Sequence, residues 1–95
     1  MKPETIQTLH PTSGKTNKLI SKEKYNLIRE NLIAILINRE LKHTELMEEL
    51  YGRVKDTFEG GVQWYGETVK LDLEARGIIE RSNDKPQRYQ IVEKK

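Results

Sequence analysis

The 95-residue chain has hydrophobic and charged side chains in nearly equal shares, 35% and 34%, a formal net charge of +2 and no cysteine. A chain of this length holds one small core, which excludes a second domain and a deep catalytic cleft, and the lack of cysteine excludes disulfides and thiolate chemistry. The N-terminus has no signal-peptide pattern, and the longest apolar run, residues 32–37, is shorter than the roughly 18 residues that span a bilayer. We therefore expect an intracellular, cytoplasmic protein without membrane contact.

The small net charge conceals an uneven distribution along the chain. Residues 1–24 carry five lysines and two glutamates, a net charge of +3, and residues 25–80 carry seven basic and eleven acidic side chains, a net charge of −4. Residues 81–95 carry five basic and two acidic side chains, again +3. Basic ends around an acidic middle bear on the choice of partner more than the total does.

The N-terminal segment shows neither the period of a helix nor that of a strand. Pro3, Pro11 and Gly14, with serine and threonine between them, indicate an irregular arm. We therefore divide the chain into an arm over residues 1–20 and a folded domain over residues 21–93.

The first predicted helix begins after Ser21, whose hydroxyl can accept from the free amides of the first turn. It is expected to run from Lys22 to about Asn38, because apolar residues recur at helical spacing at Tyr25, Ile28, Leu32, Ile35 and Leu36. A short connection over residues 40–43, which one extended strand would suit, leads to a second helix.

The second helix is indicated by Leu46, Leu50 and Val54, and Phe58 is expected to close the core at its end. Gly60 and Gly61 mark the following turn.

The third helix is expected from about Val62 to Arg76, ended by Gly77. Two short apolar runs, residues 78–81 and 88–92, follow with a polar turn between them, which predicts a terminal β-hairpin. The expected fold is mainly α with this hairpin: three helices plus a two- or three-stranded antiparallel sheet.

This order resembles a winged helix-turn-helix. The most specific likeness is the ending of the third helix, where many bacterial winged-helix regulators show L-x-x-x-L-E-x-x-G-[IL]-I-x-R; the matching residues are Val69, Leu73, Glu74, Gly77, Ile78, Ile79 and Arg81. More narrowly, residues 9–11, 64–65 and 69–77 are similar to those of a small uncharacterised bacterial winged-helix family. The likeness implies a fold, with the hairpin as the wing, and no established activity.

The resemblance implies double-stranded DNA as the partner, with the third helix in the major groove and the wing on the backbone. The residues expected to contact DNA are Gln63 and Lys70 on the helix and Arg81, Lys85 and Arg88 on the wing. The polar face of the helix also carries Glu67 and Glu74, so its charge is −1, and a solvated face without DNA contact is the alternative.

A second stripe of the third helix contains Trp64 and Leu71. Three interpretations of Trp64 are open. Its side chain belongs to the core, it is covered by the N-terminal arm through Ile6 and Leu9, or it forms an interface. Asp72 is expected to pair with Arg76 four residues later.

Two function hypotheses follow. The first is a DNA-binding transcriptional regulator or accessory factor, for which a homodimer is one candidate assembly. The second is a winged helix that serves protein interaction or dimerisation without DNA. His10 and His43 are not spaced as ligands, and no nucleophile–base pair is apparent. We therefore expect no enzyme, no catalytic residue, no metal and no cofactor.

Overall fold

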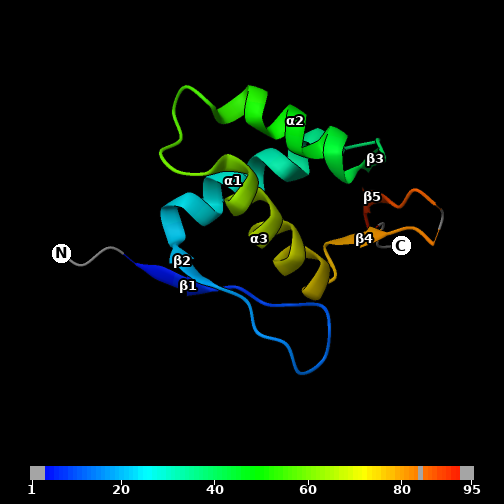
Figure 1. The fold of residues 1–95 in the computed structure, drawn as a ribbon, viewed down its shortest axis with the longest axis horizontal. Helices are drawn as coiled ribbons and strands as arrows, with labels where there is room; N and C mark the ends of the chain where they lie inside the picture. Colours follow the sequence, from blue (N-terminus) through cyan, green and yellow to red (C-terminus); the bar gives the residue numbers. More distant parts are fainter. Residues whose placement is uncertain (1–3, 84, 93–95) are drawn as a thin grey trace.

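The computed structural model describes residues 4–83 and 85–92, which form three helices and two small antiparallel sheets (Figure 1). In chain order the elements are β1 (Thr5–Gln7), β2 (Leu19–Ser21), α1 (Lys22–Leu36), β3 (Leu41–Lys42), α2 (His43–Val54), α3 (Val62–Ala75), β4 (Ile79–Arg81) and β5 (Arg88–Ile91). The expected small fold of three helices with an antiparallel sheet is confirmed. Among the described residues, no helix combines the length and the apolar character that crossing a membrane requires.

The core lies among the three helices and is closed by side chains from the strands. Its most deeply buried side chains have no exposed surface and come from all three helices: Ile28, Leu32, Leu46, Leu50, Val69 and Leu73. Phe58, which follows α2, is also buried and closes the core as expected. The helical spacing of the apolar residues therefore identified the buried faces correctly.

Helix α1 begins as predicted and ends two residues earlier than predicted. The Ser21 hydroxyl accepts a hydrogen bond from the backbone N–H of Lys24 at 3.4 Å. At the other end, Ile37 is extended and Asn38 has a positive φ of 58°. Asparagine is one of the few residues that adopt this left-handed conformation readily, so the chain leaves the helix there.

Helix α2 follows β3 directly, and its first turn is fixed by Glu45, whose Oε1 accepts from the backbone N–H of Lys42 at 3.0 Å. Leu46, Met47 and Leu50 turn into the core, whereas Tyr51 is 56% exposed. This tyrosine belongs to the surface and lies on the side of α2 that faces α3.

Two glycines of α2 and α3 stand in opposite environments and provide a matched pair of variants. A Cβ added at Gly52 would meet nothing within 4 Å, whereas one at Gly66 would lie 2.7 Å from Leu50 Cδ2 and 2.9 Å from Met47 Sδ. Gly52→Ala is therefore expected to raise the free energy of unfolding by about 1 kcal/mol through helix propensity. Gly66→Ala gains the same propensity but overpacks the α2–α3 contact, which costs about 1–3 kcal/mol.

Urea unfolding followed by circular dichroism checks this pair. Equal stabilities of the two variants would contradict the close approach of α2 and α3 at Gly66.

Helix α3 ends where the sequence predicts. Gly77 has a φ of 75°, its N–H donates to the Glu74 carbonyl at 3.1 Å, and the N–H of Ile78 donates to the Leu73 carbonyl at 2.9 Å. These two bonds form a Schellman motif, in which glycine takes the left-handed position without steric cost. The chain then turns directly into β4.

The C-terminal hairpin joins β3 in a three-stranded sheet with the order β3-β5-β4. The central strand β5 pairs antiparallel on both sides, with Tyr89 opposite Leu41 of β3 and opposite Arg81 of β4. Tyr89 is buried against the helices. The sheet therefore has three strands, the larger of the two numbers expected.

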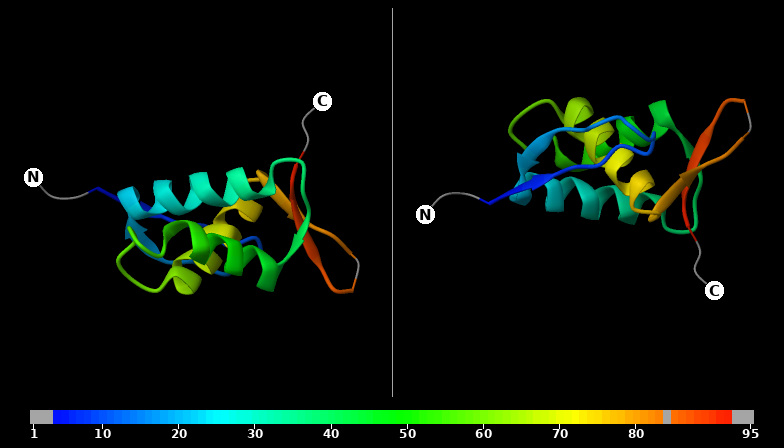
Figure 2. Two further views of the ribbon diagram at one scale, coloured as in Figure 1. Left: turned by 90° about the horizontal axis from the view of Figure 1, so that it is seen from above. Right: turned by 90° about the horizontal axis from the view of Figure 1, so that it is seen from below.

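The prediction of an irregular N-terminal arm is wrong. Strand β1 pairs antiparallel with β2, with Ile6 opposite Ile20, and the loop between the strands lies beside the C-terminal half of α3 (Figures 1 and 2). Each strand has only three residues, too few to show a clear alternation of apolar and polar side chains. Burial of Ile20 in the core fixes the hairpin, and that contact depends on the tertiary structure.

Candidate interaction surface

A buried carboxylate fixes the position of the N-terminal hairpin on the helices. Asp72 of α3 is fully buried, and its Oδ1 accepts from the backbone N–H of Leu9 at 2.8 Å. Its Oδ2 accepts from the Tyr25 hydroxyl of α1 and from Arg76 Nε at 2.8 Å. The expected Asp72–Arg76 pair is therefore confirmed, and it is part of a junction that joins three segments distant in sequence.

A second clamp holds the other side of the same loop. Asn17 Nδ2 donates to the carbonyl of Leu9 at 2.9 Å and to the carbonyl of Thr68 in α3 at 3.0 Å. The loop between β1 and β2 therefore packs on its own domain and forms a wall beside α3.

The side of α3 that faces away from the core, called here the α3 face, consists of Gln63, Trp64, Glu67, Leu71 and Glu74. Gln63, Trp64 and Glu67 are exposed, whereas the side chain of Glu74 is nearly covered by its pairing with Arg81. Trp64 is 48% exposed, and its ring lies edge-on to that of Tyr65 with 4.9 Å between the ring centroids. The interpretation that places Trp64 in the core is therefore wrong. Leu9, which was expected to help cover the tryptophan, is itself 42% exposed, and about half of the Trp64 side chain stays uncovered.

The prediction that Lys70 contacts DNA is wrong, because this lysine is buried. Only 4% of it is exposed, and its Nζ lies 3.9 Å from the centroid of the Tyr89 ring and 3.1 Å from His43 Nδ1. The face of an aromatic ring attracts a cation and shields it from water. Burial and, secondarily, the nearby Lys70 lower the pKa of His43.

The two wing arginines expected to contact DNA are engaged by carboxylates of this chain. Arg81 donates to Glu74 Oε2 at 2.8 Å, and Arg88 donates to Glu40 Oε1 at 3.1 Å. The hydrogen bond to Glu74 raises the pKa of Arg81. Lys85 is exposed on the connection between β4 and β5, apart from both pairs.

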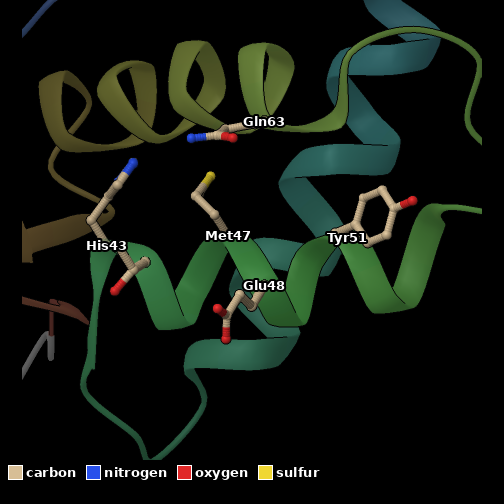
Figure 3. A pocket seen from close by; sticks show the side chains of 6 residues that line it. His43, Met47, Glu48, Tyr51 and Gln63 are labelled. Carbon is tan, nitrogen blue, oxygen red and sulfur yellow. The ribbon is translucent and has the colours of Figure 1, made fainter.

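A hollow between α2 and α3 borders the α3 face on one side (Figure 3). Its volume is about 370 Å³, and its lining comes from α2 and from the first turn of α3: His43, Thr44, Met47, Glu48, Tyr51 and Gln63. Met47 points from α2 toward Gln63, which approaches from α3 (Figure 3). Gln63 therefore lies at this hollow, near the N-terminal end of α3, whereas Arg81 belongs to β4, which follows the C-terminal end of α3.

A larger hollow borders the α3 face on the other side, with a volume of about 660 Å³. Its lining comes from the β1–β2 loop, α3 and β4: His10, Pro11, Thr12, Glu67, Leu71, Glu74, Ile79, Glu80 and Arg81. We call it the acidic hollow, because it contains three glutamates and one arginine.

One atom of the acidic hollow lacks a partner. The side chain of Glu74 is 5% exposed, its Oε2 accepts from Arg81, and its Oε1 is buried without a hydrogen-bond partner in the part of the chain that the structure describes. A buried charged oxygen without a donor is costly. The helical spacing placed Glu74 with Glu67, but no sequence signal placed His10 or Glu80 beside them.

The donor set of the acidic hollow does not suit a metal ion. Within residues 4–83 and 85–92, no group of three histidine, cysteine, aspartate or glutamate side chains is arranged to hold one.

Comparison with known proteins gives a family and no function. The model of a family of unknown function (DUF6958) matches residues 5–89. No curated protein and no solved structure matches the chain.

Proposed function

The chain belongs to the DUF6958 family. We propose that it is a winged-helix module whose α3 face binds another protein. The observation that carries this proposal is the composition of the face, where the half-exposed Trp64 stands with Glu67 and Glu74 while Lys70 is turned inward. Aromatic side chains are enriched at protein interfaces.

The order of the elements supports the winged-helix assignment. Helices α2 and α3 are joined by residues 55–61 as a helix-turn-helix pair, and α3 runs into the β4–β5 hairpin, which corresponds to the wing. Strand β3 completes the small sheet. In this class the third helix presents the recognition surface, which here is the α3 face.

The charges of the α3 face suit a protein better than a phosphate backbone. Proteins that bind DNA neutralise phosphates with lysine and arginine. Here Glu67 is exposed, Lys70 is buried, and Arg81 is already paired with Glu74, whose side chain is 5% exposed. A duplex in contact with this face would meet the carboxylate of Glu67 and would find Lys70 out of reach.

The same charges disfavour a symmetric dimer formed through the α3 face. In a two-fold dimer each patch meets its own copy, which would place the exposed Glu67 of one copy near the Glu67 of the other. Like charges across an interface oppose association. The proposed partner is therefore a different surface, one that bears apolar and basic groups.

Selection from a random peptide library displayed on phage tests the proposal. The wild-type protein is expected to enrich peptides whose affinity, measured by calorimetry, falls about 30-fold in Trp64→Ala, the loss typical of a buried aromatic hot spot. Ile37→Ala is the matched control, because Ile37, which follows α1, is a large apolar residue of similar exposure, 55% against 48% for Trp64, and lies outside the α3 face. Its expected change is less than about threefold.

Two outcomes contradict the proposal. Either the selection enriches no peptide above background, or the enriched peptides bind Trp64→Ala as tightly as they bind the wild type. Dispersed amide signals of Trp64→Ala in NMR spectra establish that the variant is folded, which its half-exposed position leads us to expect.

DNA binding is the second candidate, and the placement of the basic side chains favours it. Lys85 and Arg88 lie on the wing, and Lys15 and Lys18 lie on or beside the β1–β2 loop, all of them exposed. The loop and the wing both stand beside the C-terminal half of α3 (Figure 2). Binding of a random-sequence duplex at low salt that is lost in Lys85→Ala and Arg88→Ala, but is unchanged in Trp64→Ala, would favour this candidate over the first.

A further inference from the structure

We infer that the acidic hollow binds an arginine side chain of the partner, which donates to the unpaired Oε1 of Glu74. This inference rests on the proposed function and names the chemistry of the partner. The observation behind the inference is Oε1 of Glu74, which has no hydrogen-bond donor among the described residues although the side chain is only 5% exposed.

The charge of the hollow selects a cation. Glu67, Glu74 and Glu80 contribute three negative charges, and Arg81 contributes one positive charge. Arg81 occupies only one oxygen of Glu74, at 2.8 Å, and Glu80 accepts a hydrogen bond from the neutral Gln90 at 2.8 Å. The lining therefore keeps an excess of two negative charges, which a guanidinium from outside reduces.

The apolar part of the lining fits the stem of the same side chain. Leu71 and Ile79 lie among the carboxylates, and the methylene groups of arginine pack on apolar surface while the charged end reaches polar groups. Walls from α3, β4 and the β1–β2 loop enclose the position. The 660 Å³ of the hollow is ample for one such side chain.

Access to Oε1 needs only a local rotation. Glu74 lines the hollow, and the terminal torsion of a glutamate side chain has broad minima, so a small rotation of the carboxylate can expose Oε1 to the hollow. The rotation moves both oxygens, and the side chain of Arg81, which is 40% exposed, can follow Oε2. A planar guanidinium presents several N–H donors in a fixed fork, and it bonds carboxylates more specifically than an ammonium does. Arg81 already illustrates this pairing at the same carboxylate.

NMR titration with a pair of peptides tests the inference. The probe is acetyl-Gly-Gly-Arg-Gly-Gly-amide, and its control replaces arginine with citrulline, which has nearly the same shape and no charge. The arginine peptide is expected to shift the amide signals of Leu71, Glu74 and Glu80 in a saturable manner, and the citrulline peptide is expected to leave them unchanged.

Two glutamate variants locate the binding. Glu74→Gln is expected to weaken binding of the arginine peptide about tenfold, the loss typical when a charge partner is removed. Glu67 lies on the exposed rim of the hollow, so Glu67→Gln tests the same prediction without disturbing the Glu74–Arg81 pair. Its expected loss of affinity for the arginine peptide is smaller, about threefold. Glu48→Gln, at the hollow on the other side of α3, is the control and is expected to bind like the wild type.

The result that overturns the inference is equal binding of the arginine and citrulline peptides, or arginine-dependent shifts that persist in both Glu74→Gln and Glu67→Gln. The peptide selection separates this failure from that of the proposed function. Selected peptides that depend on Trp64 but contain no arginine would remove the inference and leave the function in place, whereas the absence of any Trp64-dependent peptide would remove the function.

Discussion

Replacing Asp72 by alanine is expected to lower the free energy of unfolding by several kcal/mol, because two donors lose their acceptor at about 1–3 kcal/mol each. Asp72 has no exposed surface, and the variant leaves the Leu9 N–H and the Tyr25 hydroxyl without their acceptor. Arg76 also loses its partner, but water can solvate its charge because 35% of its side chain is exposed. Urea unfolding followed by circular dichroism measures the loss.

The control for this variant is Asp56→Ala. Asp56 is exposed in the segment after α2, so its replacement is expected to change the stability by less than about 0.5 kcal/mol. Asp72→Asn keeps the shape and one acceptor, and its expected stability lies between those of the wild type and Asp72→Ala. Equal stabilities of Asp72→Ala and Asp56→Ala would show that the junction contributes nothing.

The loss in Asp72→Ala has a local component that the global measurement does not resolve. The N–H of Leu9 is held by Asp72, and the N–H of Thr8 donates to the Lys18 carbonyl at 3.0 Å inside the hairpin. The variant removes the acceptor of the Leu9 N–H itself, whereas the N–H of Thr8 keeps its acceptor. We therefore expect the amide of Thr8 to exchange with solvent faster in the variant than in the wild type, while the amides of buried α1 residues change less. Such a difference would show that the hairpin separates from α3 before the helices unfold.

The helices were predictable from sequence because their signals are local. Ser21 begins α1, Gly77 ends α3, and the apolar residues between these two recur at the spacing of one buried face. Each of these signals acts within a few residues of the chain. Prediction from a single sequence succeeds under those conditions.

The candidate site was harder to predict, because its residues are assembled from distant segments. A helical wheel places Lys70 on the polar side of α3, but Tyr89 of β5 and His43 of α2 hold its ammonium inside the domain. The position of Tyr89 follows from the pairing of β5 with two strands. No spacing within α3 contains that information.

The acidic hollow shows the same limit. Glu67 and Glu74 share a helix face that the sequence reveals, whereas Glu80 joins them through the turn at Gly77, and His10 joins through the bonds that tie the β1–β2 loop to α3. The charge of −1 expected for the α3 face assumed that Lys70 and Glu74 are both exposed. Both side chains are covered, and Glu67 carries the exposed charge of this face.

The hydroxyl of Tyr25 is expected to make stability fall steeply above pH 10. Burial and the hydrogen bond to Asp72 raise the pKa of Tyr25 to about 12, whereas the pKa of tyrosine in an unfolded chain is about 10. A raised pKa in the folded state favours the protonated phenol. Its contribution is therefore complete below pH 10 and is lost as the pH rises from 10 to 12, in total about 2–3 kcal/mol.

Tyr25→Phe isolates this contribution, because it removes the titrating group and keeps the ring. The free energy of unfolding of the wild type is expected to fall about 2–3 kcal/mol further than that of the variant between pH 10 and pH 12. Lysines titrate in both proteins, so their effect cancels in the difference. The phenolate absorbance of the wild type minus that of the variant reports the same group directly, and a midpoint near pH 10 in the folded protein would refute the burial of Tyr25 against Asp72.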